Sequence, residues 1–124
     1  MHVLCLSSEA AFLGHVATAF ADRITSLKTL SDPDEFIAAA NDGTVEIFLI
    51  DFDQLHLKYA DPVAFIRKMP AGSRVLVIGS LTFADWHQPL QDIGTAILHK
   101  PTAIAEVGLV LRRLIAEASR ENRS

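Results

Sequence analysis

The stretch EIFLIDFDQ, Glu46 to Gln54, contains an apolar run that ends on a carboxylate. Every residue from Ile47 to Ile50 is apolar, which is typical of a strand buried on both faces of a parallel sheet. Asp51 closes this run, and a second acid, Asp53, follows two residues later. Because a buried strand has little structural reason to end on a charge, Asp51 is the first candidate for a functional residue.

The same unit, a short apolar run followed by a stretch of helical length, occurs five times along the 124 residues. The expected strands are Val3–Leu6, Ile24–Leu30, Val45–Ile50, Val75–Ile78 and Thr95–Leu98. Strands that alternate with helices at this spacing form βαβ units with right-handed crossovers. The sequence therefore predicts one α/β domain over residues 1–118, a flavodoxin-like (βα)5 three-layer sandwich whose parallel sheet has the order 2-1-3-4-5.

Capping residues mark several of the expected helices. Asp32 and Asp61 each precede a proline, so each can cap a helix in which proline occupies the first position. Gly43 is expected to end the former helix, and Pro89 to make the fourth helix short or kinked. The last helix is expected to run from about Thr102 to Ala118, followed by a frayed polar tail, residues 119–124.

Composition disfavours several classes of partner. The net charge is −4, with no basic cluster beyond the Arg112–Arg113 pair, so direct binding of nucleic acid is not expected. No apolar run approaches the about 20 residues needed to cross a bilayer. The first residues read as a strand with no basic leader, so we expect a cytoplasmic protein without membrane association.

The residues that would mark an enzyme or a cofactor site are scattered. The five histidines lack the spacing of metal ligands, and no glycine-rich phosphate loop follows the first strand. The lone cysteine, Cys5, lies in an apolar run and is expected to be buried. We therefore expect no bound cofactor and no enzyme activity from these residues.

Parallel sheets of this kind bind ligands outside the carboxyl ends of the strands, where the strand order reverses. In the order 2-1-3-4-5 that point lies between the first and third strands. The residues expected there are Ser7, Ser8, Glu9, Asp51, Asp53, Gly79, Ser80, His99, Lys100 and Pro101.

Three segments, FLIDFDQL, VLVIGS and AILHKP, resemble the third, fourth and fifth strands of the receiver domain of bacterial response regulators (CheY-like domains). The resemblance extends over essentially the whole chain. It implies that Asp51 is the phospho-accepting aspartate and that Lys100 contacts the phosphoryl group. The catalysis that it implies is at most self-phosphorylation or dephosphorylation at Asp51. Either Gly79 or Ser80 takes the place of the serine or threonine that moves toward that group.

The chain also departs from the receiver pattern. Ser7 and Ser8 stand where receivers carry the acids that hold Mg²⁺, and Ile97 stands where they carry an aromatic switch residue. The expected Mg²⁺ site is therefore incomplete and weak, unless Glu9 or Asp53 joins Asp51 in it. These departures indicate an atypical member, a pseudo-receiver.

Three functions remain open from the sequence. The first is a protein-interaction or dimerisation module in a two-component phosphorelay, and the second is a working acceptor phosphorylated on Asp51 by a histidine kinase. A flavodoxin-like small-molecule binder is a distant third. In a structural alternative that excludes none of these, Asp51 forms an ion pair with Lys100.

The resemblance also implies a surface for self-association. Receivers commonly pair through the face formed by the fourth helix, the fifth strand and the last helix. The residues expected on it here are Phe83, Trp86, Ile97, Leu109 and Val110. A homodimer through this face, and a histidine kinase or an output domain as further partners, are the protein contacts that we expect.

Overall fold

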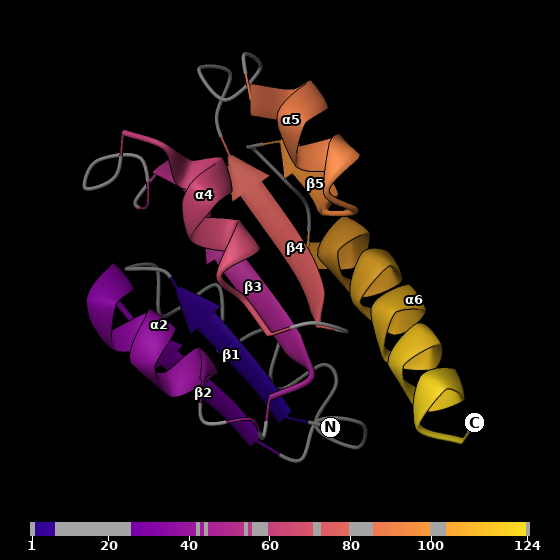
Figure 1. Ribbon diagram of the computed structural model, residues 1–124. Helices are drawn as coiled ribbons and strands as arrows, with labels where there is room; N and C mark the ends of the chain where they lie inside the picture. Colours follow the sequence, from indigo (N-terminus) through magenta and orange to yellow (C-terminus); the bar gives the residue numbers. More distant parts are fainter. Residues whose placement is uncertain are drawn as a thin grey trace.

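The computed structural model of the chain describes residues 2–6, 26–41, 43, 45–53, 55, 60–70, 73–79, 86–99 and 104–123. Within them lies a five-stranded parallel sheet of the predicted order, β2-β1-β3-β4-β5 (Figure 1). Its strands are β1 (His2–Leu6), β2 (Ser26–Leu30), β3 (Ile47–Asp51), β4 (Arg74–Gly79) and β5 (Ala96–His99). The helices are α2 (Pro33–Ala40), α4 (Pro62–Arg67), α5 (His87–Asp92) and α6 (Ile104–Arg123). The predicted flavodoxin-like α/β fold is confirmed.

Alternate residues of the central strands supply two hydrophobic cores, one on each face of the sheet. Leu4, Phe48 and Val77 pack beneath α2, α4 and α5. Their neighbours Cys5 and Leu49 pack instead beneath α6 (Figure 1). Because successive side chains of a strand point to opposite faces, a strand covered on both sides must be apolar at every position. This explains the continuous apolar run of β3.

The aspartate–proline pairs cap helices as predicted. The Asp32 carboxylate accepts a hydrogen bond from the Asp34 N–H at 3.4 Å, and the Asp61 carboxylate accepts one from the Ala64 N–H at 3.1 Å. The end of α2 differs from the prediction. The helix ends at Ala40, and Gly43, with φ +85°, lies in the turn beyond it.

The last helix is longer than predicted. It continues to Arg123, so residues 119–123, which we expected to be a frayed tail, have helical backbone. Arginine and glutamate, which make up three of these five residues, are good helix formers. Where its side chains are described, the buried side of α6 is formed by Val107, Leu111, Leu114 and Ile115.

Strand register defines two ends of the sheet. Along one end, Leu6 lies beside Ile50, Asp51 beside Ile78, and Gly79 beside His99. We call this end the carboxyl rim. The opposite end, where β1, β3 and β4 begin at His2, Ile47 and Arg74, is the amino edge.

Candidate functional site

Asp51 is the last residue of β3 and lies half-buried at the carboxyl rim. It follows Ile50, which is paired with the end of β1, so it stands where the order of the sheet reverses. Its Oδ1 accepts a hydrogen bond from the N–H of Asp53 at 3.1 Å. An aspartate that accepts from an amide two residues on stabilises a turn, and the chain turns out of the sheet here into helical backbone.

The Phe52 side chain anchors this turn in the hydrophobic core. Its side chain is 1% exposed and belongs to the core beneath α2, α4 and α5. The ring contacts Trp86, which immediately precedes α5, with ring centroids 6.3 Å apart and planes inclined by 50°. The residue that follows Asp51 is thus in direct contact with the start of α5.

Of the acids proposed to bind a metal, the structure brings Asp51 and Asp53 together in one turn. Within the described ranges, no group of three or more histidine, cysteine, aspartate or glutamate side chains could hold a metal ion. Glu9 lies outside those ranges. Mg²⁺ in proteins is commonly held by one or two carboxylates, together with water and substrate oxygens.

The other residues implied at the phosphoryl site are described only in part. Ser80 and Lys100 lie outside the described residues. The residues before them, Gly79 and His99, are neighbours in the paired strands β4 and β5. Asp51 is in register with Ile78, so β3, β4 and β5 end together at the carboxyl rim.

The residues expected at a protein interface have different surroundings. Trp86 and Ile97 are half-buried and pack against the core beneath α2, α4 and α5, whereas Val110 packs against the core beneath α6. Leu109 is 67% exposed, whereas the buried side of the same helix faces the core. Phe83 lies outside the described residues.

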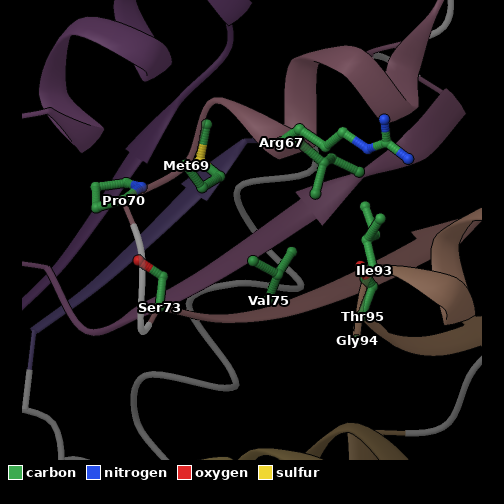
Figure 2. Close-up of a pocket in the computed structure, with 9 residues that line it drawn as sticks. Arg67, Met69, Pro70, Ser73, Val75, Ile93, Gly94 and Thr95 are labelled. Carbon is green, nitrogen blue, oxygen red and sulfur yellow. The ribbon is translucent and has the colours of Figure 1, made fainter.

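A groove lies at the other end of the sheet from Asp51, and the sequence did not indicate it. It has a volume of about 290 Å³ and runs between the end of α4 and the turn that leads into β5. In Figure 2, Val75 of β4 lies between Ser73 on one side and Ile93 and Thr95 on the other. This volume is at the lower limit of ligand sites. Among the described residues that line it, Arg67 is charged and exposed.

Polar contacts also gather at the amino edge. The backbone N–H of His2 donates to Glu46 Oε2 at 2.6 Å, and the Glu46 carbonyl accepts from the N–H of Arg74 at 3.0 Å. The Arg74 Nε lies 3.3 Å from Oε2 of Glu117 on α6. The sequence did not indicate these contacts, because the partners lie far apart in the chain. The one signal was that His2, Glu46 and Arg74 lie at the start of a strand or directly before it.

No protein-family model and no curated protein matches this chain. Several solved structures do match it in fold. The REC domain of AraT, a response regulator from Geobacillus stearothermophilus, superposes with a TM-score of 0.73 at 16% identity, over 98% of this chain and 97% of that one. NtrX from Brucella abortus, solved in complex with ADP, gives 0.73 at 19% identity, over 99% of this chain but 28% of that longer one.

A third match has a different description. It is a protein described as an adenylate cyclase from Rhodopirellula baltica, with a TM-score of 0.78 at 12% identity over 98% of this chain and 92% of that one. At identities this low, the likenesses show a shared fold. They confirm that the chain has the fold of response-regulator receiver domains, as the resemblance of its strand motifs implied. No helix in the described part of the chain has the length and apolar character needed to cross a membrane.

Proposed function

We propose that this chain is a receiver-like signalling domain of a two-component or phosphorelay system, and that it acts by binding protein partners. The observation that carries the proposal is the position of Asp51. It ends β3 at the carboxyl rim, beside the end of β1, in a sheet of order 2-1-3-4-5. Sheets of this order place their reactive groups at this point.

The residues around Asp51 favour a role in protein binding over efficient phosphorylation. Phosphoryl transfer depends on a cation that bridges the oxygens and neutralises developing charge. In this chain Asp51 and Asp53, with Glu9 as a further candidate, would hold Mg²⁺, because Ser7 and Ser8 replace the acids of the receiver pattern. Asp53 already donates its backbone N–H to Asp51, so one oxygen of Asp51 is engaged in the turn.

A working phospho-acceptor is the second candidate. Asp51 is half-buried at the carboxyl rim. In that case a histidine kinase would supply the phosphoryl group to Asp51, and Lys100 and Ser80 would contact it. The two candidates differ in whether Asp51 binds Mg²⁺ and a phosphoryl group at all.

A titration with Mg²⁺ and beryllofluoride, a phosphoryl mimic, separates the two candidates. Amide NMR spectra of the wild type and of Asp51→Ala are recorded side by side. We expect no saturable shifts around β3, β4 and β5 in either protein at generous Mg²⁺. Saturable shifts that vanish in Asp51→Ala would establish the phospho-acceptor and overturn the preference for a phosphorylation-independent module.

The partner surface is tested separately. We propose that a second copy of the chain binds the face of α5, β5 and α6, with Leu109 contributing exposed apolar surface. Leu109→Glu should then lower the mass measured by light scattering at high concentration. Ala38→Glu, which adds the same charge at an exposed position of α2, serves as the control. Equal masses for wild type and Leu109→Glu would exclude this placement of the interface.

A further inference from the structure

The groove of Figure 2 lies at the amino edge of the sheet, away from Asp51. Three segments line it: the end of α4, the start of β4 and the turn between α5 and β5. Arg67, Ser73 and Thr95 contribute polar side chains. Most of the described side chains that line it are apolar, namely Ile66, Met69, Pro70, Val75 and Ile93. An apolar lining with a few polar groups is typical of sites that bind small organic molecules.

Backbone hydrogen bonds and core packing hold the walls of the groove in place. At the end of α4, the Met69 N–H donates to the Ile66 carbonyl at 3.0 Å, and both side chains are buried in the core. On the opposite wall, the N–H of the buried Thr95 donates to the Leu90 carbonyl at 3.2 Å. A ligand that binds here therefore does not have to order these segments, which lowers the cost of binding.

Arg67 supplies a positive charge to the groove. Its side chain is exposed, and in Figure 2 its guanidinium extends from α4 toward the side on which Ile93 lies. Lys68 adds a second exposed positive charge at the end of α4. The acid that precedes Ile93, Asp92, accepts a hydrogen bond at 2.8 Å from the Gln88 side chain, one turn back along α5. The charge that faces a ligand in the groove is therefore that of the Arg67 guanidinium.

The ends of α4 and α5 do not reverse this sign. The C-terminus of a helix carries a partial negative charge, because its last carbonyls lack partners within the helix. Both helices have only six residues, and carbonyls in their last turns accept from backbone N–H groups. The Phe65 carbonyl accepts from Lys68 at 3.1 Å, and the Gln91 carbonyl accepts from Gly94 at 3.0 Å. The full charge of Arg67 outweighs the partial charge that remains, so the groove favours an anion.

The volume of the groove limits the size of that anion. A water molecule occupies about 30 Å³ of the liquid, so a groove of about 290 Å³ accommodates about ten non-hydrogen atoms. A guanidinium matches a carboxylate with two parallel hydrogen bonds. A phosphate group carries a charge of about −2 and suits a site with several cationic donors, whereas the described lining is largely apolar.

We propose that this groove binds a small organic monocarboxylic acid. The carboxylate pairs with the Arg67 guanidinium, and the apolar body of the ligand packs against Val75 and Ile93. Removing that apolar surface from water contributes the rest of the affinity. The inference goes beyond the proposed function, because neither a phospho-acceptor at the carboxyl rim nor a protein-interaction module requires a ligand at the amino edge.

A titration with octanoate, an acid of about the size of the groove, is the first test. We expect saturable shifts of the Val75, Ile93 and Gly94 amides in NMR spectra, with a Kd on the order of 1 mM for so small a ligand. Octanamide, the uncharged analogue, should bind at least about fivefold more weakly, since the charge-assisted bond is lost. The inference is overturned if these amides do not shift up to about 10 mM octanoate, or if octanamide binds as tightly as octanoate.

The second test removes the charge of the groove. Arg67→Gln should weaken the binding of octanoate at least about fivefold and leave that of octanamide unchanged. Lys68→Gln is the matched control, because it removes the same charge at the next exposed position, and it should change the Kd for octanoate less than about twofold. Equal losses in the two variants would show general attraction to a positive surface and would overturn the inference.

The third test fills the groove. Val75→Phe should abolish the binding of octanoate and octanamide alike, while the amides of β1 keep their wild-type positions and report an intact fold. Should Val75→Phe fail to fold, Ile93→Phe replaces it, since Ile93 is half-buried and follows the end of α5. Binding of octanoate that persists in the filled groove would place the ligand elsewhere on the protein and overturn the inference.

Discussion

The two ends of the sheet use polar side chains in different ways. At the amino edge, Glu46 accepts from His2, which lies 44 residues away in the chain, and Arg74 pairs with Glu117 of the last helix. At the carboxyl rim, the Asp51 carboxylate accepts from an amide only two residues on. The amino edge joins distant segments, whereas the Asp51 bond shapes a local turn.

This difference predicts which substitutions change the stability of the fold and which change ligand binding. A contact between segments far apart in sequence exists only in the folded chain, so its loss appears in the free energy of unfolding. A local turn contact contributes less, because the unfolded chain can form part of it. We therefore expect substitutions at the amino edge to change stability, and substitutions at Asp51 to change mainly what the rim can bind.

The largest effect is expected at Glu117. Glu117→Gln removes the charge that faces Arg74, whose Nε is buried and whose side chain is 20% exposed. The free energy of unfolding should fall by about 1–2 kcal/mol, less than for a fully buried pair because both side chains retain some solvent. Urea denaturation measures the change.

Arg113 provides the matched control for that variant. It also faces Glu117, at 3.9 Å, but it is 60% exposed and lies one helical turn away. Arg113→Gln should cost no more than about 0.5 kcal/mol, since exposed ion pairs contribute little. If both variants lower the free energy of unfolding equally, then exposed charges alone stabilise the amino edge. The amino edge would in that case contribute little more to stability than the carboxyl rim.

The buried Cys5 of β1 tests how tightly the sheet is packed between its two ends. Burial raises the pKa of its thiol from 9.0 to about 12. Between these values the unfolded chain has lost the thiol proton while the folded chain keeps it, so stability falls as pH rises. From pH 8 to pH 10 the wild type should lose about 1.4 kcal/mol more than Cys5→Ala.

Thermal or urea unfolding of both proteins at the two pH values measures this difference. Tyrosine and lysine side chains titrate in the same range, but they are common to both proteins and cancel in the comparison. A Cys5→Ala protein with the same pH dependence as the wild type would show that the middle of β1 is open to solvent. The sheet would then be less tightly packed between its ends than the structure shows.

Glu46 should give an intermediate effect. Glu46→Ala removes the acceptor of the His2 N–H, a charge-assisted bond of 2.6 Å in a partly buried place. We expect a loss of about 1 kcal/mol. Glu46→Gln keeps an oxygen in the same position and should recover part of the loss. The backbone bonds between Glu46 and its neighbours remain in both variants, so hydrogen exchange at the start of β1 can locate the change.

Most of the fold could be predicted from the sequence because it depends on patterns within short segments. Apolar runs gave the five strands, and Asp32 and Asp61 before prolines marked two helix starts. The position of Asp51 followed from the run that it ends. The helix ends were less accurate, since polar residues after Ala118 carry no signal that distinguishes an exposed helix from a frayed tail.

The contacts between distant segments could not be predicted in the same way. The pairing of Arg74 with Glu117, and that of Phe52 with Trp86, depends on strand register and on the placement of α5 and α6. One residue of register shift turns every side chain of a strand to the other face, so such contacts require the assembled sheet. For the same reason the groove beside Val75 had no sequence signal.

A small effect on stability is expected for Asp51→Asn, and it is the result that could break the comparison. Asp51→Asn keeps an oxygen for the Asp53 N–H, so the free energy of unfolding should change by less than about 0.5 kcal/mol. Asp51→Ala, which loses that bond, should cost about 0.5–1.5 kcal/mol. Urea denaturation of both variants beside the wild type is sufficient.

A much larger loss in Asp51→Asn would have a definite meaning. If Asp51 forms a buried ion pair with Lys100, as the sequence allowed, then neutralising it leaves a buried lysine charge and costs about 3–5 kcal/mol. Lys100→Met should in that case rescue Asp51→Asn, because the double variant carries no unpaired charge. The rim would then be held by an ion pair as the amino edge is, and any ligand of Asp51 would have to compete with Lys100. A small loss would instead exclude a buried ion pair with Lys100 as the main role of Asp51.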